Sequence, residues 1–194
     1  MKPANDNSGT KFSTALKVGS IVIAQPFWRD EIYRRSVILI TDYGSTGTRG
    51  IIINKASNVH VYEVMNNPQI RINKRIYYGG PESVETVSYL HNLPSIPEAD
   101  YFGNGIYYGG DPMSLEELIR RDGMDFRKIK FFVGYVEWTS GQLEFEIASN
   151  KWWVCDITAN EIFHAAPENL WTLKLLQKGN LYGLFAEVFD PSLS

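Results

Sequence analysis

The sequence predicts a single α+β domain with a mixed or bifurcated sheet and peripheral helices. The chain has 194 residues, which is enough for one domain with a sizeable core and short for two. Apolar runs of strand length recur along it, with helical patterns interspersed among them. These segments lack the steady strand–helix alternation of a doubly wound parallel sheet, which favours a mixed sheet.

The chain is expected to begin with a tail outside the fold. Residues 1–12 are rich in Asn, Ser and Gly and are predicted to be disordered, so the domain is assigned to residues 13–194. The first apolar run, residues 20–24, is a strand that Pro26 ends.

Strands are indicated by short runs of β-branched and aromatic residues between turn residues. Two nearly continuous apolar runs flank a glycine-rich turn at residues 42–49 and predict a hairpin whose strands are covered on both faces. A strand rather than a helix follows these glycines, so they do not form a phosphate-binding loop. The expected strands are residues 20–24, 36–41, 50–54, 75–78, 87–91, 105–108, 130–136 and 152–157.

Helices are indicated by capping signals. Ser114 and Glu117 have the spacing of a capping box, and Gly123 stands where a C-terminal glycine belongs. A proline suited to the first helical turn opens the last helix, which ends before Gly179. The expected helices are residues 61–66, 115–121, 141–149 and 167–178.

The segment 141–149 fits two structures. Leu143, Phe145 and Ile147 alternate with polar residues as in a strand. Thr139 and Gln142 have capping-box spacing, and the Gln-Leu-Glu composition favours a helix, which is the prediction adopted. Leu143 and Ile147 then share one helix face.

The pentapeptide IYYGG occurs twice, at residues 76–80 and 106–110. The flanking sequences differ and no third copy exists, which argues against a structural repeat. Each copy is interpreted as a strand ended by two glycines rather than as half of a paired site. The first, Gly79-Gly80 before a proline, predicts a sharp turn at the rim of a sheet.

The composition excludes several kinds of partner. A formal net charge of −3 argues against direct nucleic-acid binding, although Arg29, Arg34 and Arg35 could form a local basic patch. The single cysteine excludes an internal disulfide, and the three histidines lack ligand spacing, so no metal and no cofactor is expected. No apolar run is long enough to span a membrane, and the N-terminus lacks a signal-peptide core, so the expected location is cytoplasmic.

Two residues could react with a substrate. Cys155 lies in an apolar strand, where a buried structural thiol is the preferred interpretation; a pairing with His164 is formally available. Glu144 is expected to be partly buried on its helix. There it would be a tuned acid or a ligand contact, or, as preferred, a structural ion pair. No catalytic residue is predicted, and an enzyme that uses Glu144 or Cys155 is the alternative.

Several motifs, taken in their order along the chain, resemble those of one family. They are GSIVIAQP with Asp30, RRSVILI at 34–40, GIIINK at 50–55, YYGGP at 77–81, GYVEW at 134–138, GQLEFEI at 141–147, Trp152 and ENLW at 168–171. Together they resemble the YqgE/AlgH family of bacterial proteins over residues 18–180. The resemblance implies a compact α+β fold with a bifurcated, partly barrel-like sheet and surrounding helices. Members of this family are often labelled transcriptional regulators, but the label is not a demonstrated DNA-binding activity. The resemblance implies no catalytic or metal residues. The family usually has a small residue and a glycine where this chain has Val136-Glu137.

The function predicted from these observations is a non-catalytic binding or regulatory module whose partner is an unknown protein or small molecule. Its site is expected where special turns and polar groups occur in apolar surroundings. The candidate ligand-binding residues are Arg35, Asn54, Gly79, Gly80, Trp138, Gln142 and Glu144.

Overall fold

The computed structural model describes residues 15–65, 72–121 and 124–179. The predicted tail and Gly123 lie outside these residues. The described strands are β1 (Ile21–Ala24), β2 (Val37–Gly44), β3 (Gly47–Ile52), β4 (Ala56–His60), β5 (Arg75–Tyr78), β6 (Glu82–His91), β7 (Asp100–Gly103), β8 (Ile106–Tyr108), β9 (Ile129–Thr139) and β10 (Trp152–Cys155). The helices are α1 (Val61–Val64), α2 (Pro112–Arg120), the 3-10 helix η1 (Phe126–Lys128), α3 (Gln142–Ala148), α4 (Ala159–His164) and α5 (Pro167–Lys178).

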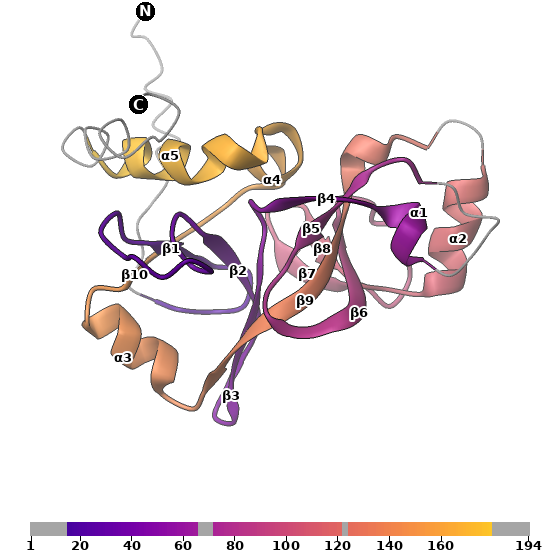
Figure 1. The fold of residues 1–194 in the computed structure, drawn as a ribbon. Helices are drawn as coiled ribbons and strands as arrows, with labels where there is room; N and C mark the ends of the chain where they lie inside the picture. The colour runs from indigo at the N-terminus through magenta and orange to yellow at the C-terminus, as the bar shows by residue number, and fades with distance from the viewer. Residues whose placement is uncertain (1–14, 66–71, 122–123, 180–194) are drawn as a thin grey trace, which may run out of the picture.

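The sheet is mixed and branches at β9. The strands follow the order β10-β1-β2-β3-β9-β6-β8-β7, and β4 and β5 form a side branch that also joins β9. The β5–β9 pair is parallel, while the other pairs are antiparallel. The prediction of a mixed, bifurcated sheet is therefore confirmed, and the sheet is not closed into a barrel (Figure 1).

Helices cover both faces of the β10-β1-β2 part of the sheet (Figure 1). One face packs against α5 through Leu170, Trp171 and Leu175. The opposite face packs against α3 through Leu143 and Ile147. Strands buried between two layers need apolar residues at successive positions, which is why the continuous runs in β1 and β2 predicted them correctly.

The glycines of the first pentapeptide lie where the sheet forks. The Gly79 amide donates to the Val133 carbonyl of β9, while the Gly79 carbonyl accepts from the Ile52 amide at the end of β3. A Cβ atom on Gly80 would lie 2.1 Å from the Tyr135 carbonyl oxygen. Only glycine lets the two backbones approach so closely, so these residues form the branch. Both pentapeptides are strand ends, as predicted.

The structure corrects three local predictions. Asp111 caps α2 in place of Ser114, because its carboxylate accepts from the Met113 and Ser114 amides, and the helix therefore begins at Pro112. The turn predicted at residues 42–49 is mostly strand, since β2 runs to Gly44 and β3 begins at Gly47. Four of the described elements, β4, β7, η1 and α4, were not predicted from the sequence.

Candidate functional site

Asn54 and Arg35 hold the start of β2. The Asn54 Oδ1 atom accepts from the Val37 amide and its Nδ2 donates to the Arg35 carbonyl, both at 2.8 Å. The Arg35 guanidinium lies 4.9 Å from the centre of the Trp171 ring, which links this turn to α5. Both residues thus have structural contacts, and their role in ligand binding stays a prediction.

A carboxylate connects Trp138 and Gln142, two of the other predicted residues. Glu146 Oε2 accepts from the indole N–H groups of Trp138 at 3.1 Å and Trp152 at 2.8 Å. Gln142 donates to Glu146 Oε1 at 3.4 Å and accepts from the Thr139 amide and hydroxyl. The arrangement satisfies two buried indoles and closes the turn between β9 and α3.

The expectation that Glu144 is partly buried was wrong. Glu144 is exposed, and a hydrogen bond to its carboxylate raises the pKa of the Tyr43 phenol. The inward stripe of α3 contains Leu143 together with Glu146 and Ile147, which follow it by three and four residues. Glu144 lies about 100° away from Leu143 around the helix axis and so faces solvent.

Cys155 is fully buried in β10, as expected. Burial raises the pKa of its thiol to about 12, so the reactive thiolate is scarce near neutral pH. His164 is exposed on α4. No group of three or more His, Cys, Asp or Glu residues in the described part of the chain could hold a metal ion.

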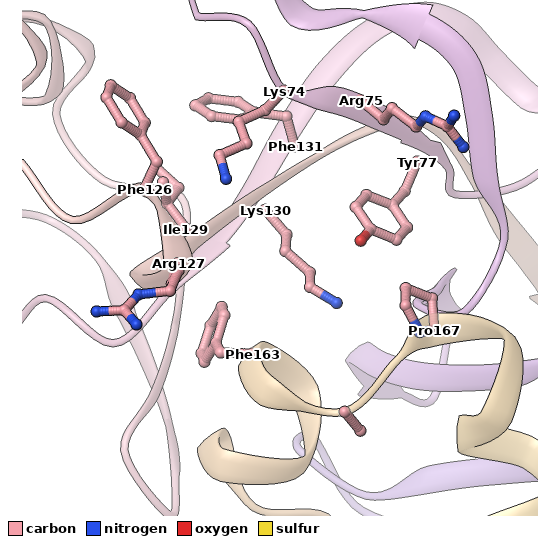
Figure 2. A pocket seen from close by; sticks show the side chains of 11 residues that line it. Lys74, Arg75, Tyr77, Phe126, Arg127, Ile129, Lys130, Phe131, Phe163 and Pro167 are labelled. Atoms are coloured by element: carbon pink, nitrogen blue, oxygen red, sulfur yellow. The ribbon is translucent and has the colours of Figure 1, made fainter.

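A pocket lies outside the set of residues predicted from the sequence. It is a hollow of about 180 Å³ between β5, η1, the start of β9 and the α4–α5 connection. Figure 2 shows its side chains. The lining residues are Lys74, Arg75, Tyr77, Phe126, Arg127, Ile129, Lys130, Phe131, Phe163, Ala165 and Pro167.

Parallel pairing of β5 with β9 brings the pocket's central residues together. Tyr77 pairs with Phe132. Lys130 precedes Phe132 by two residues in the same strand, so its side chain leaves the sheet on the same face as the Tyr77 ring. The Lys130 Nζ atom lies 4.7 Å from the centre of that ring. The strand register therefore places an ammonium group against an aromatic face at the pocket wall.

The lining is cationic. Four basic side chains surround the hollow, and none of the described lining residues is acidic. Lys74 and Lys130 direct their ammonium groups into it, whereas the guanidinium groups of Arg75 and Arg127 lie towards opposite sides (Figure 2). Arg127 is already paired, since its Nε donates to Asp125 at 2.9 Å and this contact holds the pKa of Asp125 at about 2.

Lys130 is half-buried, and burial lowers its pKa to about 8. The exposed Glu168 on α5 acts in the opposite direction, because its negative charge favours the ammonium form. Burial and the charge of Glu168 both raise the pKa of the Tyr77 phenol, so that hydroxyl stays protonated at neutral pH. Burial therefore favours the neutral form of the Lys130 amine, and the carboxylate of the exposed Glu168 is the group that favours its ammonium form.

The sequence contains a signal for this pocket, although a weak one. Two basic residues precede Ile-Tyr-Tyr in residues 74–78, and basic residues alternate with aromatic and aliphatic ones in residues 126–132. Each segment alone has the pattern of an ordinary strand with a solvated face. Only the parallel pairing of β5 with β9 shows that the two segments face one hollow.

The fold and the pocket define a single-domain α+β protein with a basic, ring-lined hollow. Among its described helices, none is long and apolar enough to cross a membrane. The chain belongs to the AlgH-like family, whose match spans residues 21–182, and the resemblance noted from the motifs is therefore confirmed.

Relatives in this family share most of their length with the chain. A UPF0301 protein of Parabacteroides distasonis is 36% identical over 183 residues, which cover 91% of this chain and 90% of the relative. A UPF0301 protein of Bacteroides thetaiotaomicron is 34% identical over 164 residues, 84% of each chain. These names assign no activity.

Two solved structures share the fold. The solution structure of AlgH from Pseudomonas aeruginosa has a TM-score of 0.68 at 23% identity and covers 95% of this chain and 96% of its own. A crystal structure of a Corynebacterium diphtheriae protein has a TM-score of 0.71 at 22% identity and covers 87% and 90%. Both likenesses concern the fold alone.

Proposed function

We propose that the chain is a non-catalytic binding module that takes a small anionic ligand into the basic pocket. The observation that carries this proposal is the set of four cationic side chains around an aromatic-lined hollow with no acidic lining residue among those described.

The charge balance of the pocket favours an anion. A half-buried ammonium is stable when a counter-charge lies close to it, and the exposed Glu168 supplies only part of one for Lys130. Lys74 adds a second positive charge to the same hollow (Figure 2). A bound anion would offset both charges in surroundings where electrostatic interactions are stronger than in water.

The shape of the pocket limits the ligand. A hollow of about 180 Å³ is smaller than the usual site of a drug-sized molecule, which favours a compact ligand over a polymer segment. Phe126, Phe131 and Phe163 supply apolar surface beside the cations. A compact anion with an attached ring or short carbon chain fits both features.

The proposal includes a regulatory role and a cytoplasmic location. The location is supported by the cysteine content, since a chain with one cysteine has no internal disulfide framework of the kind that stabilises many secreted domains. An enzyme that uses Glu144 or Cys155 is less well supported. The first residue is exposed, and burial raises the thiol pKa of the second to about 12.

The test is titration calorimetry at pH 7 with inorganic phosphate and phenyl phosphate. We expect saturable binding of both anions and tighter binding of phenyl phosphate, because its ring can contact the lining phenylalanines. The double variant Lys74→Met/Lys130→Met should bind phenyl phosphate at least about tenfold more weakly, since it loses both inward ammonium groups. Lys128→Met is the matched control, because Lys128 is an exposed lysine of η1 that does not line the pocket. No saturable binding at millimolar concentration, or equal binding by the double variant, would refute the proposal.

A further inference from the structure

We propose that Lys130 captures a small anionic aldehyde by forming a reversible imine inside the basic pocket. The inference deepens the proposed function and rests on it, because the cations that seat the anion also place its carbonyl group near the Lys130 amine.

The position of Lys130 separates it from ordinary surface lysines. Its Nζ atom lies at the wall of a hollow rather than in open solvent, 4.7 Å from the centre of the Tyr77 ring. No carboxylate in the described part of the chain lies at ion-pair distance from it. The Lys74 side chain lines the same hollow (Figure 2). A lysine amine that is partly removed from water in a ring-lined pocket, without a carboxylate partner, has the surroundings typical of an imine-forming lysine.

Burial and the neighbouring charge of Glu168 act on the Lys130 pKa in opposite directions. Burial favours the neutral Lys130 amine. Lys74 and Arg75 on the β5 side are exposed, so water screens their charges from it. Arg127 on η1 is largely neutralised by Asp125, and Glu168 on α5 favours the ammonium. Burial is the largest effect, and the pKa of Lys130 falls to about 8. Roughly a tenth of the amine is then unprotonated at pH 7, against fewer than about one in a thousand for an ordinary lysine.

The reaction needs no oxidant or reductant. The lone pair of the neutral Lys130 nitrogen attacks the carbonyl carbon, a C–N bond forms, and the carbonyl π pair moves to oxygen, which takes up a proton. The resulting carbinolamine loses one water molecule to give the imine, and hydrolysis reverses the sequence. The Tyr77 hydroxyl is directed towards Lys130 and stays protonated, so it can donate the proton to the leaving hydroxyl (Figure 2).

Lys174 and the half-buried Lys55 lack these features. Lys174 is fully buried, but its Nζ atom is bound to Glu161 at 2.5 Å and to the Asp156 carbonyl at 3.1 Å. The Lys55 ammonium donates to the Ile32 carbonyl. Neither lysine lines the pocket, so the site of imine formation is predicted to be Lys130.

The experiment uses pyridoxal 5′-phosphate as the probe, since it joins an aldehyde to a phosphate. The protein is mixed at pH 8 with less than one equivalent, the imine is reduced with borohydride, and the labelled peptides are mapped by mass spectrometry. We expect Lys130 to carry at least about tenfold more label than Lys128, because its amine is unprotonated more often. Lys130→Arg should abolish the main label while keeping the charge, and Lys74→Met should reduce it. Lys128→Arg, the matched control, should leave it unchanged.

Two measurements separate this inference from the proposed function. If phenyl phosphate binds but the label is spread over exposed lysines, the imine is refuted and the anion site stands. If phenyl phosphate does not bind and Lys130 is labelled no more than Lys128, both proposals fail. The labelling rate of Lys130 should also rise with pH through about 8 and then level off; a rate that keeps rising towards pH 10, as for a surface lysine, would contradict the inference.

Discussion

Lys130 should lower the stability of the folded chain near neutral pH, so replacing it with methionine should raise stability. Burial lowers the Lys130 pKa from an ordinary value of 10.5 to about 8. Each pKa unit is worth about 1.4 kcal/mol, so this difference corresponds to at most about 3 kcal/mol of lost stability. The contact between the ammonium and Tyr77 offsets about 0.5–1 kcal/mol of it. Lys130→Met should therefore raise the free energy of unfolding by about 2 kcal/mol at pH 7.

The gain should depend on pH in a defined direction. Between pH 8 and 10.5 the unfolded lysine binds more protons than the folded one, so the stability of the unmodified chain rises with pH across this window. The cost of the buried ammonium is fully present below pH 8 and is lost above 10.5. The advantage of Lys130→Met should accordingly be largest at pH 6 to 7 and should vanish near pH 10.5.

Urea unfolding followed by tryptophan fluorescence at several pH values between 6.5 and 10 measures this difference. Comparing the variant with the unmodified chain at each pH removes the contributions of Cys155 and the tyrosines, which both proteins share. Lys128→Met should change stability by less than about 0.5 kcal/mol at every pH, because Lys128 is exposed. The reasoning fails if Lys130→Met is destabilising at pH 6.5, or if its effect does not change with pH.

Three further predictions concern a buried ion pair, a close approach of two backbones and the buried thiol. Lys174→Met should destabilise the fold by about 3–5 kcal/mol in urea titrations, because the half-buried Glu161 carboxylate loses its cation. If adding Glu161→Gln to this variant does not restore most of the lost stability, the broken ion pair is not the cause of the loss. Gly80→Ala should lower the free energy of unfolding by about 3 kcal/mol or prevent folding. In the control variant Gly44→Ala the added Cβ meets no atom within 4 Å, so stability should change by less than about 0.5 kcal/mol. Similar thermal midpoints for the two variants would contradict the close approach of the Gly80 and Tyr135 backbones. Cys155 should react with a thiol-specific disulfide reagent at pH 8 only as fast as the chain unfolds, and rapid labelling of the folded protein would show an accessible thiolate.

Several elements could be predicted from the sequence because their signals are local. The apolar runs of β1 and β2 are buried on both faces, so every residue in them carries the pattern. The last helix has Pro167 in its first turn and Gly179 at its end, and the structure has it at Pro167–Lys178 as predicted. Residues 141–149 were correctly assigned to a helix, although the predicted cap was wrong. Gly141 rather than Thr139 is the N-cap, and the Thr139 amide donates to Gln142 Oε1 instead.

The strands β4 and β7 could not be predicted in this way, whereas α4 was missed although Thr158 and Glu161 have capping-box spacing. Strand β4 is mostly exposed and pairs with β5 alone, so no continuous apolar run marks it. The choice between Glu144 and Glu146 as the inward carboxylate depended on how α3 is rotated against Trp138 and Trp152. That rotation is set by packing against β9 and β10 rather than by the helix itself.

The sequence by itself determined which segments form β1, β2, β5 and α5, and that two glycines end each pentapeptide, because those choices depend on neighbouring residues along the chain. Tertiary structure alone decided that Tyr77 and Lys130 face one another. They are 53 positions apart (130 − 77 = 53), and only the parallel pairing of β5 with β9 sets their register. The burial that lowers the pKa of Lys130 arises from the same pairing and from the α4–α5 connection that closes the hollow.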